Sequence, residues 1–386
     1  MKTILVLHRY PPQQVVGTNA SFIEFLKELS LKGYKTYYLT YKEESQNSRK
    51  LDEEINNLEF IRIPFSFNRG NNFDKKLKTY LWIITAPFYV SRLQKKHNID
   101  LVYCDDSVPF YGFFSKILSS RSKVIIRLGD LQTGYALADE HPKLFKLILK
   151  VERYMWGKVD GIIAISNPFK AFIVKQGIGE EKIKVVKESI NLDGVDFEKV
   201  DASKTGVVAF HGSVVKCKGL KVLLDAFYLF NTDFPETKLV VAGGGEEESR
   251  IKQYAKEKDI KNVEFTGWYD HNKLDEIMDD VQIAVVMRSP NMANNFVVTT
   301  CLLEDWKFKK PVLVPDLEAF KEVIVGGENG VLFKVGNVED LSDKLRVLYK
   351  EEQRYERLVR GGLTTAKETF DHKKIAKSMV EALFGV

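Results

Sequence analysis

Three loops of this chain carry the residue types that bind phosphate and sugar groups. In the second of them, Gly212 follows an apolar run and Lys218 stands immediately before a segment of helical period. A glycine lets the backbone approach a ligand closely, and an ammonium at a helix start can neutralise a diphosphate. Taken alone, Lys218 is better explained as an ordinary surface lysine in this lysine-rich chain. The chemistry therefore has to be judged from several loops together.

The first loop runs from His8 to Asn19 and opens a helix that we expect to end at Gly33. Gly17 permits close approach, and Thr18 or Asn19 can cap the helix, whose unpaired amides favour an anion. A simple connector containing proline and glycine explains the same residues. The position of the loop directly after the first predicted strand makes it a candidate for phosphate binding.

The third loop begins at Ser289 and leads into an amphipathic helix. Thr299 or Thr300 can cap this helix and present hydroxyl and amide donors to a ligand. Glu304 lies about one turn into the helix, where its carboxylate could accept hydrogen bonds from sugar hydroxyls. The alternative is a glutamate that faces water, as most helical glutamates do.

Length and composition limit the class of protein. A chain of 386 residues exceeds the usual size of one hydrophobic core, so we expect two domains. The 58 basic and 53 acidic residues give a net charge of +5, which favours phosphate-rich ligands or an anionic membrane but does not indicate nucleic acid binding. Cys104, Cys217 and Cys301 stand far apart without a CxxC pair, which argues against a disulfide framework and a zinc site.

The hydropathy of the chain predicts a cytoplasmic protein, with one segment that could contact the membrane face. No stretch approaches about eighteen consecutive apolar residues, and the first residues lack a signal-peptide cleavage site. Within residues 67–97, basic residues flank an aromatic-rich run around Trp82, which suits a helix lying on a membrane surface. Pro87 and the all-round apolar pattern suit a helix packed on the first sheet equally well.

Alternating strand and helix patterns place these loops. In the first half of the chain, short apolar runs are separated by longer segments of helical period. The predicted strands are residues 3–8, 35–40, 100–104, 123–128 and 161–165, and the predicted helices are residues 19–32, 76–97, 108–118 and 143–157. This alternation predicts a parallel sheet covered by helices on both faces.

The same pattern restarts after a polar stretch at residues 193–205. The predicted strands are residues 207–211, 238–242, 263–266, 282–286, 311–314 and 331–333, and the predicted helices are residues 219–230, 247–258, 299–309 and 338–351. We therefore expect an α/β protein of two doubly wound domains, residues 1–200 and 206–370, which face each other across a cleft. Ligands should bind outside the carboxyl ends of the strands.

In this order and at these separations, the loops resemble those of the retaining GT-B glycosyltransferases of family four. The resemblance spans nearly the whole chain, and each of its segments is short. They are Tyr10-Pro11-Pro12 through Gly17, Asp160 through Ser166, His211-Gly212-Ser213 with Lys218-Gly219, Leu239 through Gly245, Val263 through Gly267, and Leu303 through Val312. The resemblance implies two Rossmann-like domains and transfer of a sugar from a nucleotide-diphosphate donor to a glycan, lipid-linked or small-molecule acceptor.

The resemblance also implies a role for each site residue. Lys218 would stabilise the departing diphosphate and Glu304 would hold the donor ribose. The implied catalytic residues are Lys218, Asp130, Thr299 and Thr300, and the implied donor-binding residues are Gly17, Gly212, Ser213, Lys218, Gly267, Trp268, Arg288, Asn294, Asn295 and Glu304. We expect no metal ion, and no cofactor beyond a UDP-, GDP- or other nucleotide-sugar substrate.

Two departures from the family pattern affect the expected donor contacts. Phe296 stands where the first of two glutamates is usual, and Asn294 or Asn295 could replace its contact with the sugar. Ser213 stands where an arginine is usual, and Lys216 or Arg288 could supply the missing charge.

A third departure is Asp130, which follows a predicted strand where a histidine is common and could position the donor sugar. These departures leave two alternatives to the transferase: a nucleotide-sugar-binding protein without activity, and a GT-B epimerase, for which the sequence shows no suitable carboxylate pair. Similar proteins also return a carboxyl-terminal helix to the first domain. We expect residues 372–386 to do so, since their apolar positions form one stripe.

Overall fold

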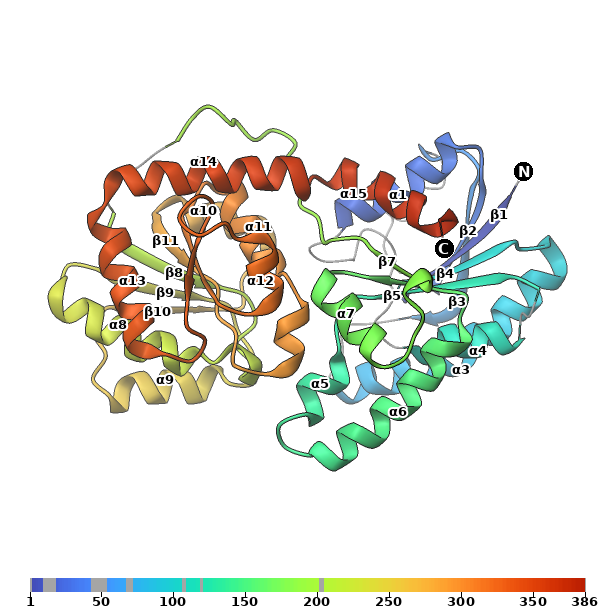
Figure 1. Cartoon of the computed structure of the whole chain (residues 1–386), viewed down its shortest axis with the longest axis horizontal. Helices are drawn as coiled ribbons and strands as arrows, with labels where there is room; N and C mark the ends of the chain where they lie inside the picture. The colour runs from blue at the N-terminus through green and yellow to red at the C-terminus, as the bar shows by residue number, and fades with distance from the viewer. Residues whose placement is uncertain are drawn as a thin grey trace. The chain divides into compact units, whose positions relative to one another are not determined.

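A computed structural model describes residues 2–9, 19–42, 54–66, 72–105, 109–118, 121–200 and 205–385 of the chain (Figure 1). The chain forms two compact units, residues 1–191 with 372–386, and residues 192–371. Each unit is built on one parallel sheet with helices packed against it. The predicted α/β class with two doubly wound sheets is confirmed.

The sheet of the first unit has seven strands in the order β3-β2-β1-β4-β5-β6-β7. They are β1 (Thr3–Leu7), β2 (Lys35–Lys42), β3 (Leu58–Ser66), β4 (Leu101–Asp105), β5 (Lys123–Leu128), β6 (Gly161–Ala164) and β7 (Ile183–Val185). Only β3 and β7 are absent from the sequence prediction. β3 contains Pro64, which an edge strand tolerates because one of its sides has no ladder partner.

The helices of the first unit lie on both faces of this sheet. They are α1 (Asn19–Leu31), α3 (Asn72–His97), α4 (Pro109–Leu118), α5 (Gln132–Leu137), α6 (Pro142–Lys158), α7 (Asn167–Lys175), the short η2 (Glu180–Lys182) and α15 (His372–Phe384). Ile4 and Ile125 pack with α1 and α15 on one face. α4 covers the other face, where a Cβ on Gly112 would lie 2.4 Å from Ile126 Cγ2.

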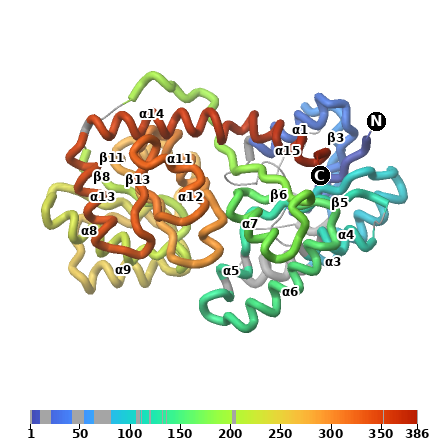
Figure 2. Tube along the Cα trace, in the orientation of Figure 1, coloured from blue at the N-terminus to red at the C-terminus, as the bar shows by residue number. Residues whose placement is uncertain are grey.

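The carboxyl-terminal helix α15 belongs to the first unit, although α14 before it belongs to the second. Figures 1 and 2 show α15 beside α1. The buried side chains of α15 that pack in this core are Ile375, Ala376, Met379, Val380, Ala382 and Leu383. They form the apolar stripe seen in the sequence, and α1 covers it.

The sheet of the second unit has six strands in the order β10-β9-β8-β11-β12-β13. They are β8 (Val207–His211), β9 (Lys238–Ala242), β10 (Val263–Gly267), β11 (Val281–Val285), β12 (Val312–Pro315) and β13 (Val331–Phe333). The order reverses between β8 and β11, and the carboxyl ends of these two strands therefore flank the topological switch point, where doubly wound folds bind their ligands.

The helices of the second unit also cover both faces. They are η3 (Lys216–Lys218), α8 (Leu220–Asp233), α9 (Glu248–Glu257), η4 (His271–Lys273), α10 (Leu274–Asp279), η5 (Met292–Phe296), α11 (Thr300–Lys307), α12 (Glu318–Val323), α13 (Val338–Lys350) and α14 (Glu352–Thr369). α8, α9 and α13 share a core that contains Phe227, Ile251 and Leu345. α14 packs on α11, where a Cβ on Gly362 would lie 2.3 Å from Trp306 Cδ1.

The boundary between the units lies at Asn191 and not near residue 200, where the sequence placed the end of the first domain. The segment after Asn191 packs against α14 because both are apolar at the contact. The side chains involved are Val195, Phe197 and Val200 on the segment and Tyr355, Val359 and Leu363 on α14. This strip therefore belongs to the second unit.

The segment proposed from sequence as a membrane helix is α3, whose first described residue is Asn72. Trp82, Ala86 and Val90 are buried at a spacing of one helical turn, so α3 packs against the first unit through this stripe. Ile84 and Phe88 on the same helix remain exposed, at 61% and 64%. No helix among the described residues is long and apolar enough to cross a bilayer.

Candidate functional site

The candidate site lies at the carboxyl ends of β8 and β11, on either side of the switch point in the second unit. His211 is the last residue of β8, and Arg288 follows the end of β11. The loops after these strands hold most of the residues that the sequence indicated. The site therefore lies where the topology of the sheet predicts it.

Glycines let the loop after β8 pack against its neighbours. Gly212 has φ 127°, and a Cβ there would lie 3.2 Å from Cys301 Sγ. A Cβ on Gly243, which follows β9, would lie 1.9 Å from Gly212 O. The Gly212 N–H donates to Ala242 O at 2.9 Å, and Ser213 is partly buried in the same loop. Gly243 is therefore required by close backbone approach, and Gly212 is favoured by its positive φ.

Lys218 ends the short helix η3, and Gly219 after it adopts the left-handed conformation (φ 68°) from which α8 starts. The lysine side chain is only 7% exposed. Burial and the nearby positive charge of Arg288 lower the pKa of Lys218 to about 8. Within the described residues, no acidic side chain forms an ion pair with Lys218. Its ammonium is thus a buried group with no carboxylate ion pair among the described residues.

Asn294 connects the loop of Lys218 to the loop of Arg288. Its Oδ1 accepts a hydrogen bond from Arg288 Nη1 at 3.2 Å, and its Nδ2 donates to Cys217 O at 3.1 Å and Ser289 O at 2.8 Å. The Ser289 N–H also donates to Cys217 O at 2.9 Å. These bonds fix the residues next to Lys218 and Arg288, which explains why the two cations lie close together.

Both asparagine side chains of this segment are engaged within the protein. Asn294 is 1% exposed, and its amide makes the bonds given above. Asn295 accepts a hydrogen bond from the Glu318 N–H at 3.3 Å and donates to Met292 O at 3.4 Å. In this structure the two amides hold loops together, and the sugar contact expected of Asn294 or Asn295 stays a prediction. Phe296 beside them is buried.

The start of α11 is capped by Thr299, whose Oγ1 accepts a hydrogen bond from the Leu302 N–H at 3.4 Å. Thr300 is the first helical residue and is partly buried. Of the two threonines considered from sequence, Thr299 is therefore the cap. Glu304 lies on the same helix and is 6% exposed.

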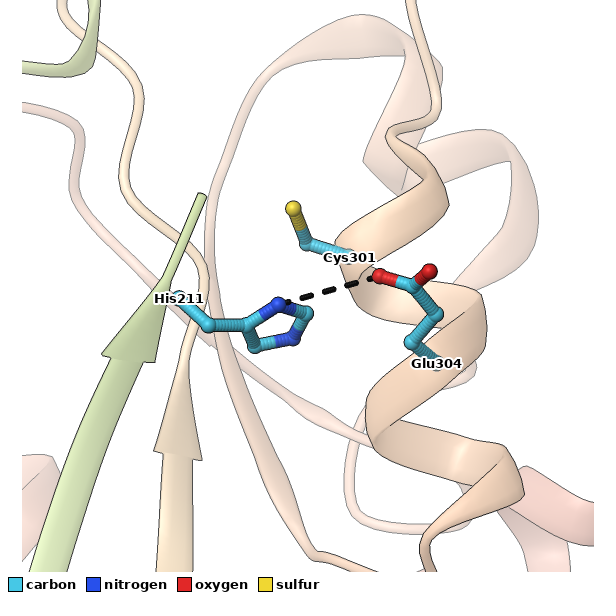
Figure 3. Close-up of side chains that lie close together, drawn as sticks. All are labelled: His211, Cys301 and Glu304. Atoms are coloured by element: carbon cyan, nitrogen blue, oxygen red, sulfur yellow. Dashed lines mark ion pairs between the residues drawn. The ribbon is translucent and has the colours of Figure 1, made fainter. Parts of the chain in front are cut away.

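A histidine faces each oxygen of the Glu304 carboxylate. Glu304 Oε2 lies 3.7 Å from His211 Nδ1, which is the ion pair drawn in Figure 3, and Glu304 Oε1 lies 3.2 Å from His271 Nε2. His271 is exposed on its other side, and its pKa is raised chiefly by the hydrogen bond with Glu304. Glu304 is therefore a buried carboxylate held between two rings.

His211 is itself held between two carboxylates, since its Nε2 donates to Asp305 Oδ1 at 2.9 Å. Burial alone would lower the pKa of His211, but its interactions with Cys301, Asp305 and Glu304 outweigh burial and raise the pKa to about 10. The ring is therefore cationic at neutral pH and donates from both nitrogens.

His211, Cys301 and Glu304 also form a set of potential metal ligands, with one ligand atom of each within 4.8 Å of the others (Figure 3). Imidazole, thiolate and carboxylate are zinc ligands, and Asp305 orients the imidazole ring as outer carboxylates do in zinc sites. A metal would first have to displace the proton on His211. The absence of a CxxC pair could not exclude this set, because its members come from β8 and α11.

The loop after β10 adds an aromatic side chain. Gly267 ends the strand at φ 67°, and Trp268 after it is 73% exposed. A Cβ on Gly244 would lie 2.6 Å from Trp268 Cδ1, so the indole rests on that glycine. Tyr269 beside it has a raised pKa, chiefly because of burial. The indole thus offers a flat apolar surface at this sheet edge.

Four of these residues had no role in the sequence-based prediction: His211, Tyr269, His271 and Asp305. Only His211 had a usable signal, since it directly precedes Gly212 in a loop already considered. Two other predicted residues lie elsewhere. Gly17 is outside the described residues, and Asp130 follows β5 in the first unit, where it is partly buried.

Sequence and structure comparisons agree on the family. Residues 195–364 match the family described as glycosyl transferases group 1, and residues 15–193 match Glycosyltransferase Family 4. The structure is similar to that of Anabaena HepE in complex with UDP and glucose, with a TM-score of 0.72, 15% identity and 100% of each chain covered. This chain belongs to the GT-B glycosyltransferases of family four.

Other similar proteins are also glycosyltransferases by name. A glycosyltransferase structure from Rickettsia africae covers 99% of this GT-B chain and 97% of its own, with a TM-score of 0.70 and 18% identity. An uncharacterized glycosyltransferase of Methanocaldococcus jannaschii is 23% identical over 60% of this chain and 61% of its own length. The phosphatidyl-myo-inositol mannosyltransferase of Mycobacterium leprae is 29% identical over 42% of each. The chain thus spans less than two thirds of these two relatives.

Proposed function

We propose that this GT-B chain is a retaining, metal-independent hexosyltransferase that uses a nucleotide-diphosphate sugar. The observation that carries the proposal is the pair formed by Lys218 and Arg288, two neighbouring cations at the switch point of the second sheet. Neither has an acidic partner within the described residues. A buried cation costs free energy unless an anion accompanies it, so this site favours an anionic ligand.

A diphosphate suits the site because negative charge grows on the leaving oxygen as the glycosidic bond lengthens. A fixed cation aimed at that charge stabilises the transition state more than the ground state. Lys218 is fixed by burial, and Arg288 is held by Asn294. Arg288 then supplies the charge that Ser213 lacks. Thr299 caps α11, and the amino end of this helix, with Thr300 and Cys301, lies in the same site.

Glu304 is assigned to the ribose of the donor. Its carboxylate is buried and already oriented by His211, and the exposed His271 can give up its contact when sugar hydroxyls donate to Oε1. Trp268 offers a surface on which a base could stack. UDP is the first nucleotide to try, because HepE, which shares this fold, has been crystallised with UDP and with UDP-glucose.

The acceptor is a glycan, a lipid-linked sugar or a small molecule at the cytoplasmic side. A phosphate oxygen of the donor itself would take the proton of the acceptor hydroxyl, so the mechanism needs no separate protein base. Asp130 in the first unit would position the donor sugar.

A second candidate function is nucleotide-sugar binding without transfer. It is favoured by Phe296, which is buried and apolar at the position where the first glutamate of the family is usual. A protein can keep such a fold and lose its activity. Hydrolysis or transfer of the donor sugar separates the two candidates.

The test is a thermal-shift panel of UDP, GDP, ADP and their sugar conjugates, followed by donor turnover with and without acceptor extracts. A ligand that binds only the folded state raises the melting temperature. We expect one nucleotide to do so and its sugar conjugate to be consumed, with EDTA leaving turnover unchanged. Binding without turnover would favour the second candidate. If EDTA abolishes turnover and added zinc restores it, the enzyme is not metal-independent. His211, Cys301 and Glu304 would then be assigned as the zinc ligands.

A further inference from the structure

Large apolar side chains that remain exposed are concentrated on three helices of the first unit, α3, α4 and α6. Of the thirteen in the described part of the chain, nine lie on these helices. They are Ile84 and Phe88 on α3, Phe114, Ile117 and Leu118 on α4, and Leu144, Leu147, Val151 and Tyr154 on α6. Scattered exposed apolar residues are ordinary, but a concentration of this kind marks an interaction surface.

α6 carries a buried and an exposed set of apolar side chains. Its inner side buries Phe145, Met155 and Trp156. Its outer side carries Leu144, Leu147, Val151 and Tyr154 at the three- and four-residue spacing of one helix face, with exposures of 45%, 59%, 42% and 58%. Packing within the first unit explains only the inner side. Among the described residues, the outer stripe stays exposed, although the Tyr154 ring contacts Phe113 of α4.

α4 and α6, which carry seven of these nine side chains, contact each other. α4 contacts both α3 and α6 in the first unit (Figure 1). The Phe113 ring lies 5.4 Å from the Phe114 ring and 5.8 Å from the Tyr154 ring, measured between centroids. The contact between Phe113 and Tyr154 bridges α4 and α6. We call the nine side chains together the α3–α4–α6 face.

Positive charge surrounds this face. α6 exposes five cations, Lys143, Lys146, Lys150, Arg153 and Lys158. The only acidic residue in α4 and α6 is Glu152, which is buried and accepts a hydrogen bond from Thr133. Asp160 beyond α6 is paired with Lys116 at 2.6 Å, and Asp139 and Glu140 precede the helix. Apolar side chains interleaved with cations match the boundary between anionic lipid headgroups and acyl chains.

We propose that the α3–α4–α6 face docks on an anionic lipid bilayer. The apolar side chains enter the headgroup boundary, and the lysines of α6 extend their ammonium groups to lipid phosphates. The surface is therefore wider than the helix within residues 67–97, because α6 supplies four of its nine side chains. A second copy of the chain is a poorer occupant, since joining two such faces would bring like charges together. The docking goes beyond the proposed function, because it requires no donor or acceptor.

The experiment is flotation of the full chain with vesicles of phosphatidylcholine alone and of equal parts phosphatidylcholine and phosphatidylglycerol. We expect flotation only with the anionic vesicles, and less of it as salt increases. Leu147→Ser with Val151→Ser should lower partitioning about tenfold through lost apolar insertion. Lys146→Gln with Lys150→Gln should lower it by about tenfold or more through lost charge.

Matched controls lie outside the α3–α4–α6 face. Leu31→Ser changes an exposed leucine on α1, and Lys256→Gln with Lys377→Gln removes two exposed lysines from other helices. These variants should float like the wild type, and all variants should keep its melting temperature. Absence of flotation at low salt would overturn the proposal, as would equal losses in the face variants and the controls. If the wild type does not float but sediments as a dimer, and only the Leu147→Ser, Val151→Ser variant disrupts that dimer, the α3–α4–α6 face would bind a second copy of the chain instead. The flotation and sedimentation results do not depend on whether the donor assay detects activity.

Discussion

Arg288 Nη1 donates a hydrogen bond to Asn294 Oδ1 at 3.2 Å, and Asn294 in turn donates to the carbonyl of Cys217, the residue before Lys218. Arg288 is thus fixed beside Lys218 by an amide and not by a carboxylate. Its charge remains available to a ligand.

We predict that Arg288→Gln weakens nucleotide-diphosphate binding about tenfold, since a charge-assisted contact is lost, while a glutamine can still donate to Asn294. Titration calorimetry measures the affinity, and Lys256→Gln on α9 is the matched control for a lost positive charge. Equal affinity in the wild type and Arg288→Gln would place the diphosphate elsewhere.

Lys218 and Glu304 should respond differently to substitution, because their proposed tasks differ. Lys218→Ala should reduce kcat more than about a hundredfold with a smaller loss of donor affinity, since its charge acts most strongly in the transition state. Glu304→Gln should mainly raise KM for the donor, because an amide still accepts a hydrogen bond but lacks the carboxylate charge. Steady-state kinetics gives both values, once each variant is shown to melt like the wild type. Wild-type kinetics in both variants would mean that the donor site is misplaced.

Donor affinity should fall as the pH rises above about 8. Burial and Arg288 lower the pKa of Lys218 to about 8, so the side chain is increasingly neutral above that pH. A diphosphate prefers the ammonium form, and its apparent Kd should then rise toward about tenfold per pH unit. Lys218→Arg should abolish this dependence because arginine stays charged. A dependence that is unchanged in Lys218→Arg would belong to another group.

The stability contribution of His211 should depend on pH in the opposite direction to that of a paired carboxylate. The folded state raises the pKa of His211 to about 10, above the ordinary value of 6.5. The stabilisation is therefore complete below about pH 6.5 and disappears as the pH rises through about 10. His211→Gln should lower the melting temperature by about 5 °C at about pH 6 and by much less near pH 10.

Scanning calorimetry of both proteins measures this difference. Comparing the wild type with His211→Gln at each pH cancels the contribution of Lys218, whose lowered pKa acts in the other direction over part of the same range. A difference between the two proteins that does not change with pH would show that the ring is uncharged in the folded state.

Leu383→Ala in α15 should destabilise the first unit. Leu383 is fully buried in the core that α15 shares with α1, and removal of its side chain leaves a cavity that costs about 2–5 kcal/mol. Lys377→Ala on the exposed side of the same helix should change stability by less than about 0.5 kcal/mol. Urea unfolding measures both, and equal effects would show that α15 contributes little to the unit.

The fold was largely predictable because most of its strands contain short apolar runs. β5, β8, β9 and β13 begin and end where the sequence placed them. α14 escaped prediction because Gly361, Gly362 and its many charged residues weaken the helical pattern. The two glycines let the helix pack closely on Glu328 and Trp306. The hydrophobic pattern of the sequence thus identifies strands and helices with regular burial. It misses a helix such as α14, whose glycines are needed for contact with neighbouring segments.

The candidate site was predictable only where a residue type is rare or its position in a loop is distinctive. Lys218 and Glu304 met the second condition, since each stands at a helix that follows a strand. The partners of Glu304 could not be predicted, because Glu304, His211 and His271 lie on three separate segments of the chain that meet only in the fold. Asn294 was assigned to a sugar for a similar reason: its hydrogen bonds to Cys217 and Ser289 depend on how two loops meet.

The return of the chain to the first unit at His372 has a consequence for synthesis on the ribosome. The second unit, residues 192–371, is complete before any part of α15 is made. Until then the first unit lacks a helix of its core, and the faces of α1 and the sheet that α15 later covers remain open. The unit that begins first is therefore the one that is finished last, and the nascent chain carries an uncovered apolar surface throughout the synthesis of the second unit.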